Sequence, residues 1–224
     1  EEAAEPFFVK ENPTLIRLKA QLQKEKQRLP TELAQTQQEL TQTEVREYFR
    51  PNLWPNTPDI LTEYLQFGGR PAFMIRLVLA ATLGASYGIY GPAFELLEAR
   101  PREPGSEEYF NSEKYEIKHW DRESADSLKE FIARINGIRR ENPALQSDWS
   151  VQFHEVDNEQ IICYTKQTED LGNVVAVVVN LDPHHVQSGW VKIPVEALRL
   201  DASYQAHDLL SGARFLWHGE KNYV

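Results

Sequence analysis

The chain has 224 residues, of which 41% are hydrophobic and 26% are charged, and its formal net charge is -10. These values are typical of a globular protein with one large core or two modest ones, and two domains are slightly favoured. The acidic balance argues against nucleic acid or an anionic membrane surface as the main partner. A single cysteine, Cys163, excludes an internal disulfide, and no stretch approaches the roughly 20 apolar residues of a membrane helix. We therefore expect a cytoplasmic protein.

The first 38 residues carry a narrow leucine stripe. Between Asn12 and Leu29 the leucines recur at helical spacing among lysine, arginine, glutamine and glutamate residues. The pattern predicts a surface helix packed on its own domain, because fewer than about three heptads are present. A docking helix that recruits a partner or a second copy of the chain, giving a homodimer, is the alternative.

Residues 39–147 alternate short apolar strands with helices, which predicts a parallel sheet. In such a sheet the loops that follow the strands carry the chemistry, and here these are residues 50–69 and 91–125. The predicted elements are strands at Val45–Phe49 and Ser86–Tyr90, and helices at 58–66, Arg70–Leu83 and Ser127–Arg140.

The ends of these helices carry recognisable signals. Pro71 fits the first turn of the second helix, and Gly84 fits the position just past its end. This helix is apolar nearly all round and should be buried. In the last helix, Ser127 and Glu130 form a candidate capping box, and Pro143 ends the helix.

After residue 147 the pattern changes to short strands separated by turn signals, which predicts an antiparallel β-sandwich over residues 148–224. The run Val174–Val179 is apolar on both faces and is expected to be a central strand. Trp149, Trp190 and Trp217 show no pattern of an exposed platform. The predicted strands are Val151–Val156, Gln160–Gln167, Asn173–Leu181, Gly189–Ile193, Tyr204–Leu210 and Arg214–His218.

The carboxylate of Asp59 is the most informative candidate in the chain. It lies behind a rigid loop, F-R-P-N-L-W-P-N-T-P-D, which is rich in proline and aromatic residues and loses little further freedom on binding a ligand. Asp59 also follows Thr57 and Pro58, which is the usual order at a helix start. On spacing alone, this structural role is favoured over a catalytic one.

Several segments resemble the maltose-1-phosphate maltosyltransferases of the α-amylase superfamily. They follow one another in the same order from residue 39 to the end, which is more specific than any single motif. The resemblance implies the last quarter of a (β/α)8 barrel over 39–147, then the β-sandwich, with residues 1–38 as a helical extension unlike the family. The matching segments are E-L-T-Q-T-E-V-R-E-Y-F-R-P-N-L-W-P-N-T-P-D-I-L (39–61), G-I-Y-G-P-A-F-E-L (88–96), G-S-E-E-Y-F-N-S-E-K-Y (105–115), I-R-R-E-N-P-A-L (138–145) and V-V-N-L-D-P (178–183).

The activity that the resemblance implies is a retaining transfer of maltosyl units from maltose 1-phosphate to the non-reducing end of an α-1,4-glucan. Such an enzyme uses an aspartate nucleophile, a glutamate acid/base and a third carboxylate that stabilises the oxocarbenium-like transition state. Asp59 matches the third carboxylate. No metal or other cofactor takes part, and the adjacent pair His184 and His185 does not suggest a metal site.

The resemblance also implies residues that bind substrate. Lys114 matches a lysine that helps to bind the donor phosphate, and a solvated loop lysine is an equally good interpretation. Phe94 stands where the family commonly has a tyrosine near the sugar, so that stacking remains but the hydroxyl is lost. Asn56 and Trp54 belong to the loop before Asp59 and are candidates for the donor pocket. For Trp54 and Arg70, core packing or loop bracing is favoured.

Neither the nucleophile nor the acid/base motif is found before Glu39. We therefore predict that this chain is a fragment or truncated paralogue of such an enzyme and is inactive alone. The alternative is a non-catalytic module that binds glucan or acts in oligomerisation as a scaffold.

Overall fold

The structure, a computed structural model, describes residues 50–224. The predicted helix of residues 12–29 and the predicted strand Val45–Phe49 lie outside these residues. Within the described part, no helix is both long enough and apolar enough to span a membrane.

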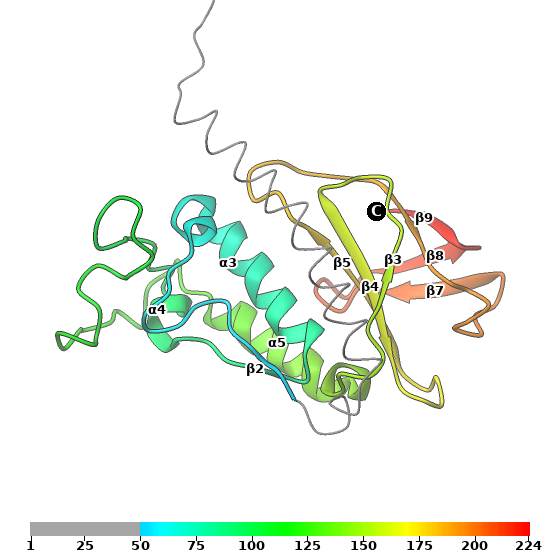
Figure 1. Cartoon of the computed structure of the whole chain (residues 1–224). Coiled ribbons are helices and arrows are strands. Elements are labelled where there is room, and N and C mark those ends of the chain that lie inside the picture. The colour runs from blue at the N-terminus through cyan, green and yellow to red at the C-terminus, as the bar shows by residue number, and fades with distance from the viewer. Residues whose placement is uncertain (1–49) are drawn as a thin grey trace, which may run out of the picture. The chain divides into compact units, whose positions relative to one another are not determined.

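A parallel strand pair and its connecting helix begin the described chain (Figure 1). Strand β1 (Asn52–Leu53) pairs in parallel with β2 (Ser86–Tyr87), and α3 (Glu63–Leu83) connects them, as the crossover between parallel strands requires. The prediction that a helix starts at residue 58 is wrong, because α3 starts at Glu63. Thr57 and Ile60 exchange two backbone hydrogen bonds of 3.2 Å, so this segment turns before the helix begins.

Helix α3 contains a kink at Gly69 where the sequence predicted a break between two helices. Gly69 has φ of 58° and ψ of -162°, a conformation that is essentially restricted to glycine. Pro71 lies two residues after Gly69, where its missing N–H costs nothing because a new helical turn starts there. The predicted end is confirmed, since the helix ends at Leu83 and Gly84 follows.

Two further helices complete this part. Helix α4 (Gly91–Glu95) follows β2, and α5 (Lys129–Glu141) is followed by the 3-10 turn η1 (Pro143–Gln146). The predicted capping box is wrong, because the hydroxyl of Ser127 accepts from the Lys129 N–H and donates to the Glu95 carboxylate. Ser127 thereby ties the start of α5 to the end of α4.

The remaining chain forms antiparallel sheets, and all six predicted strands are present. Only β9, a three-residue strand, was not predicted. The strands are β3 (Gln152–His154), β4 (Ile161–Gln167) and β5 (Val174–Asn180) in one sheet, β6 (Trp190–Lys192) paired with β9 (Lys221–Tyr223), and β7 (Ser203–His207) paired with β8 (Arg214–His218).

The prediction that Val174–Val179 forms a central strand is wrong for the described sheet. Its strand order is β3-β4-β5, so β4 is central and β5 lies at the edge. Strand β4 is buried along nearly its whole length, whereas Ala176 and Val178 of β5 are exposed on one face. Apolar composition predicted the wrong strand because the position in a sheet depends on its neighbours as well as on its side chains.

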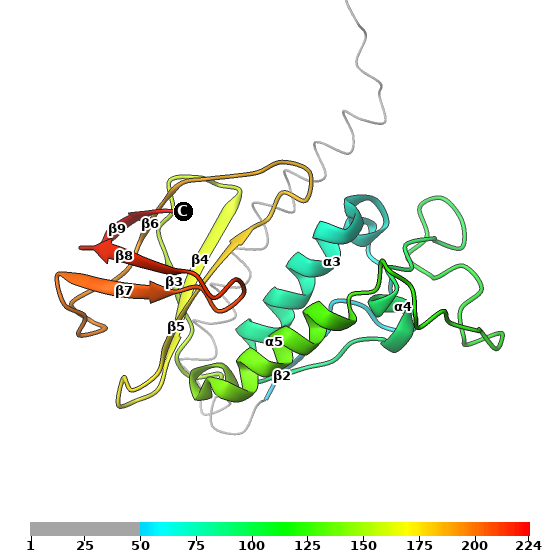
Figure 2. The same cartoon turned by 180° about the vertical axis from the view of Figure 1, so that it is seen from behind.

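Helix α3 packs on two sides, which explains why it is apolar nearly all round. Phe73 and Leu77 belong to a core with Leu61, Phe94 and Leu128. On the other side α3 packs against the sheet of β3, β4 and β5, and Figures 1 and 2 both show it between this sheet and the long loop after α4. The residues of α3 on the sheet side are Ile75, Val78, Leu79 and Leu83.

Polar contacts at the carboxyl end of α3 join it to β4. The Tyr164 and Thr82 hydroxyls lie 2.5 Å apart, and the Lys166 ammonium donates to the Leu83 carbonyl at 3.2 Å. The Lys166 side chain is fully buried, and this burial lowers its pKa to about 8. Arg139 of α5 donates to the Ala81 carbonyl in the last turn of α3, and to the Ala85 carbonyl just beyond it at 2.8 Å. Two carbonyls in the last turn of α3, those of Ala81 and Leu83, thus accept hydrogen bonds from cationic side chains.

The buried Lys166 predicts a pH dependence of stability. In the range between pH 8 and the ordinary lysine pKa of 10.5, the unfolded chain holds a proton that the folded chain has lost, so the free energy of unfolding rises with pH. Relative to Lys166→Met, it should rise by about 2 kcal/mol from about pH 7 to about pH 10. Urea unfolding of both proteins at several pH values measures this difference, and parallel profiles would contradict it.

Candidate functional site

Residues 54–59 belong to the loop between β1 and α3, and the aromatic residue of this loop covers the chain just after β2. A Cβ at Gly88 would lie only 2.6 Å from the Trp54 ring, so the ring lies directly over this glycine. Trp54 remains 49% exposed. It therefore braces the loop against the chain after β2 and also presents part of an aromatic surface to solvent.

Asn56 anchors the same loop from inside. Its side chain is buried, its Oδ1 accepts from the Tyr90 N–H at 2.9 Å, and its Nδ2 donates to the Tyr109 hydroxyl at 2.8 Å. Burial raises the pKa of Tyr109 to about 12, so this hydroxyl stays protonated. Both ends of the Asn56 amide are used within the protein, and the residue joins three loops.

Asp59 and Lys114 form an ion pair at the solvent-exposed surface. The Lys114 ammonium lies 2.9 Å from the Asp59 Oδ1, and the two side chains are 47% and 60% exposed. Hydrogen bonding to Asp59 raises the pKa of Lys114 above its ordinary value. Two of the predicted site residues, which are far apart in sequence, are thus brought together. Asp59 lies in the turn before α3, and the start of α3 is four residues further on at Glu63.

Glu113, the neighbour of Lys114, is held by two donors. The Tyr90 hydroxyl donates to its Oε2 at 2.7 Å, and the Trp120 indole donates to its Oε1 at 2.8 Å. These bonds, first the one from Trp120 and then the one from Tyr90, lower the pKa of Glu113. The sequence interpretation missed Tyr90, Tyr109, Glu113 and Trp120, although the segments 88–96 and 105–115 contain three of them.

Phe94 and Arg70 lie elsewhere. The Phe94 ring is fully buried and packs on Phe73, with ring centroids 5.1 Å apart. Its predicted contact with a sugar has no counterpart on the surface of this structure. Arg70 donates to the Asp126 carbonyl at 2.6 Å, which braces the loop before α5, as the sequence favoured.

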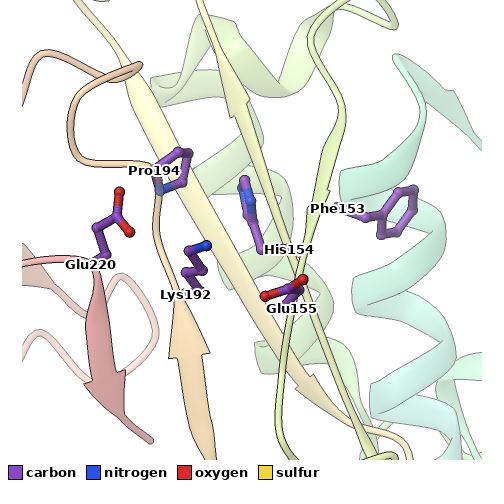
Figure 3. A pocket seen from close by; sticks show the side chains of 6 residues that line it. All are labelled: Phe153, His154, Glu155, Lys192, Pro194 and Glu220. Carbon is purple, nitrogen blue, oxygen red and sulfur yellow. The ribbon is translucent and has the colours of Figure 1, made fainter.

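A separate groove of about 260 Å³ lies in the sheet region (Figure 3). His154 accepts or donates a hydrogen bond of 2.8 Å at the Thr165 hydroxyl, and burial lowers its pKa. Among residues 50–224, no group of histidine, cysteine and acidic side chains has the arrangement of a metal site. The lining of the groove mixes the acidic side chains of Glu155 and Glu220 with the basic side chain of Lys192. The groove is lined by Phe153, His154, Glu155, Lys192, Pro194 and Glu220.

Comparisons with known proteins agree with the sequence resemblance. The family model described as "GLGE, C-terminal" matches residues 153–224. The alpha-1,4-glucan:maltose-1-phosphate maltosyltransferase of Chlorobaculum tepidum is 48% identical over 201 residues, which are 86% of this chain and 30% of the relative. That of Methylacidiphilum infernorum is 47% identical over 196 residues, which are 87% of this chain and 29% of the relative. The chain thus spans less than a third of the length of these relatives.

A solved structure shows the same kind of fold. The crystal structure of a substituted AmyP in complex with maltotriose has a TM-score of 0.54 and 17% sequence identity. The match covers 78% of this chain and 38% of that chain. At this identity the likeness concerns the fold alone.

The role of Asn56 as an internal anchor can be tested by Asn56→Ala. This change leaves the Tyr109 hydroxyl and the Tyr90 N–H without their partner, and we expect a loss of about 2 kcal/mol in the free energy of unfolding. The exposed Asn52, which accepts one hydrogen bond from Ser86, provides the control. Asn52→Ala should cost less than about 0.5 kcal/mol. Equal losses in urea unfolding would contradict the buried anchor.

Proposed function

Because the chain belongs with the carboxyl-terminal part of the α-1,4-glucan:maltose-1-phosphate maltosyltransferases, we propose that it works as part of such an enzyme. The reaction is the transfer of maltosyl units from maltose 1-phosphate to the non-reducing end of an α-1,4-glucan, with retention of configuration. The ion pair between Asp59 and Lys114 is the observation that supports a role of these two residues in the reaction.

The proposed domain division follows the sequence prediction. Residues 39–147 form the end of a (β/α)8 barrel, and residues 148–224 form a β-sandwich domain, with residues 1–38 as an extension. The parallel β1-α3-β2 unit supports the barrel assignment, because such units build the barrel wall. In that architecture Asp59 follows its strand, at the end where the active sites of these barrels lie.

Asp59 has the chemistry required of a transition-state stabiliser. In a retaining transfer the sugar ring gains positive charge as the phosphate leaves, and a fixed carboxylate stabilises that charge. The turn between Thr57 and Ile60 fixes the Asp59 backbone. A nucleophile and an acid/base are also needed. The family resemblance assigns neither of them to this chain, so we propose that it is inactive alone.

Lys114 supplies a cation for the donor phosphate. Its ammonium is exposed, and it is charged near neutral pH as lysine side chains ordinarily are. A phosphate group carries more negative charge than one carboxylate and attracts the same ammonium. In the free chain Asp59 is therefore the counterion that the donor phosphate replaces. Trp54 lies in the same loop as Asp59 and offers an exposed ring face for a sugar.

This role of Lys114 predicts a measurable loss of binding. In titrations of the chain with maltose 1-phosphate followed by phosphorus NMR, Lys114→Ala should weaken binding by about tenfold, the worth of one charge-assisted contact. Lys221→Ala, which removes an exposed lysine of β9, should leave binding unchanged. Equal affinities of the wild type and Lys114→Ala would refute the phosphate role. Release of inorganic phosphate in the presence of a glucan would refute the proposed inactivity of the chain.

A second candidate function, a module that binds glucan, is favoured by one observation. Trp190 and Tyr223 face each other across β6 and β9, with ring centroids 5.4 Å apart, and they are 50% and 60% exposed. The sequence showed no such platform, because Tyr223 lies in the unpredicted strand β9. An exposed aromatic pair of this kind offers flat apolar faces with a polar rim, which suits a sugar chain.

The platform can be tested by binding of maltodextrin without donor. Trp190→Ala should lower the affinity of the chain for maltodextrin by at least about fivefold, since it removes half of the aromatic surface. Trp54→Ala gives the matched comparison at the other site. Isothermal titration that finds the loss only in Trp54→Ala would rule out the platform.

A further inference from the structure

The ion pair between Lys114 and Asp59 needs support from other contacts. Both side chains are largely exposed, and an exposed pair gains little attraction while a long lysine side chain loses its rotamer freedom. The two residues are also 55 positions apart, on different loops. The contact at 2.9 Å therefore depends on what fixes the backbone of Lys114.

The residue before Lys114 is fixed at both oxygens of its carboxylate. Glu113 accepts from the Tyr90 hydroxyl at 2.7 Å and from the Trp120 indole at 2.8 Å. Hydrogen bonds to an ionised acceptor are the strong ones, and two of them define the direction of the side chain. Within residues 50–224, no ion pair joins Glu113 to Lys114, so the carboxylate does not compete for the ammonium.

Tyr90 is itself fixed by the loop that carries Asp59. The Asn56 Oδ1 accepts from the Tyr90 N–H at 2.9 Å, and Asn56 is buried three residues before Asp59. The contacts therefore close a circuit, which runs from Asn56 to Tyr90, to Glu113, to Lys114 and back to Asp59. Every step in this circuit is a hydrogen bond or a peptide bond, apart from the short stretch of loop that joins Asn56 to Asp59.

A tight turn makes the two neighbouring side chains diverge. Asn111 adopts φ of 49°, a left-handed conformation that asparagine tolerates. Ser112 is buried, its hydroxyl accepts from the Lys114 N–H at 3.1 Å, and its carbonyl accepts from the Tyr115 N–H at 2.9 Å. Within this turn Glu113 reaches Tyr90 and Trp120, while Lys114 reaches Asp59.

We propose that Glu113 is a positioning residue that holds Lys114 beside Asp59 through its hydrogen bonds to Tyr90 and Trp120. Glu113 does not touch the donor. Glu113 fixes the conformation of the loop so that the Lys114 ammonium lies where the donor phosphate would bind. This part of the inference rests on the proposed function. The placement of Lys114 itself is a property of the free chain and does not depend on any substrate.

The test measures Lys114 in the free chain. Its Cε resonance, in protein with labelled lysine, is followed through its titration in wild type, Glu113→Gln and Asp59→Asn. Asp59→Asn removes the ion pair but keeps the contact between Lys114 and the Tyr115 ring, so it gives the titration midpoint of a Lys114 that is no longer paired with Asp59. In Glu113→Gln the amide nitrogen faces a donor, so we expect the midpoint to move at least about half of the way to that reference. Glu108→Gln, which breaks a pair with Arg102 on the same loop, should keep the wild-type midpoint.

A wild-type midpoint in Glu113→Gln overturns the inference. Tyr90→Phe removes one of the two donors and keeps the ring, so it tests the same contact if Glu113→Gln does not fold. It should shift the Lys114 midpoint in the same direction, and an unchanged value again overturns the inference. Because no substrate is present, this outcome is distinct from a failure of Lys114 to bind maltose 1-phosphate.

Discussion

Burial of α3 on two sides is the constraint on which the rest of the described structure depends. One side of the helix lies in the core with Phe94 and Leu128, and the other packs against the sheet of β3, β4 and β5. An apolar helix of this kind is stable only when both faces are covered. The loops that carry Asp59 and Lys114 and the sheet of β3, β4 and β5 therefore share one structural element, helix α3.

The site is built by contacts between loops that start near this helix. The backbone N–H of Leu61 donates to the Glu107 carbonyl, and the Gln66 side chain donates to the carbonyls of Leu61 and Ser106 at 2.9 Å. These bonds tie the start of α3 to the long loop that carries Lys114. Asn56 ties the same loop from the other side. Exposed charges are thus positioned by buried amide groups, which cost free energy if they lose their partners.

Local patterns predicted the elements better than the contacts between them. The strands were readable because turn residues separate them, and the end of α3 was readable because Gly84 follows it. The capping box failed because Ser127 finds a partner in Glu95, and the central strand was misplaced because Val-rich β5 has fewer neighbours than β4. The pairing of Asp59 with Lys114 joins two loops distant in sequence, which no periodicity encodes. Tyr90, Tyr109 and Glu113 were visible only as parts of resembling segments, and Trp120 lies in none of these segments.

The buried amine of Lys166 can report how often the sheet separates from α3. Because the pKa of Lys166 is about 8, a large part of this amine is in the neutral, nucleophilic form under mildly alkaline conditions, and full burial shields it from reagents dissolved in water. Acylation of this side chain requires β4 to separate from the end of the helix, which is a local opening of the protein. The rate at which Lys166 is modified under mildly alkaline conditions therefore measures how often that local opening occurs.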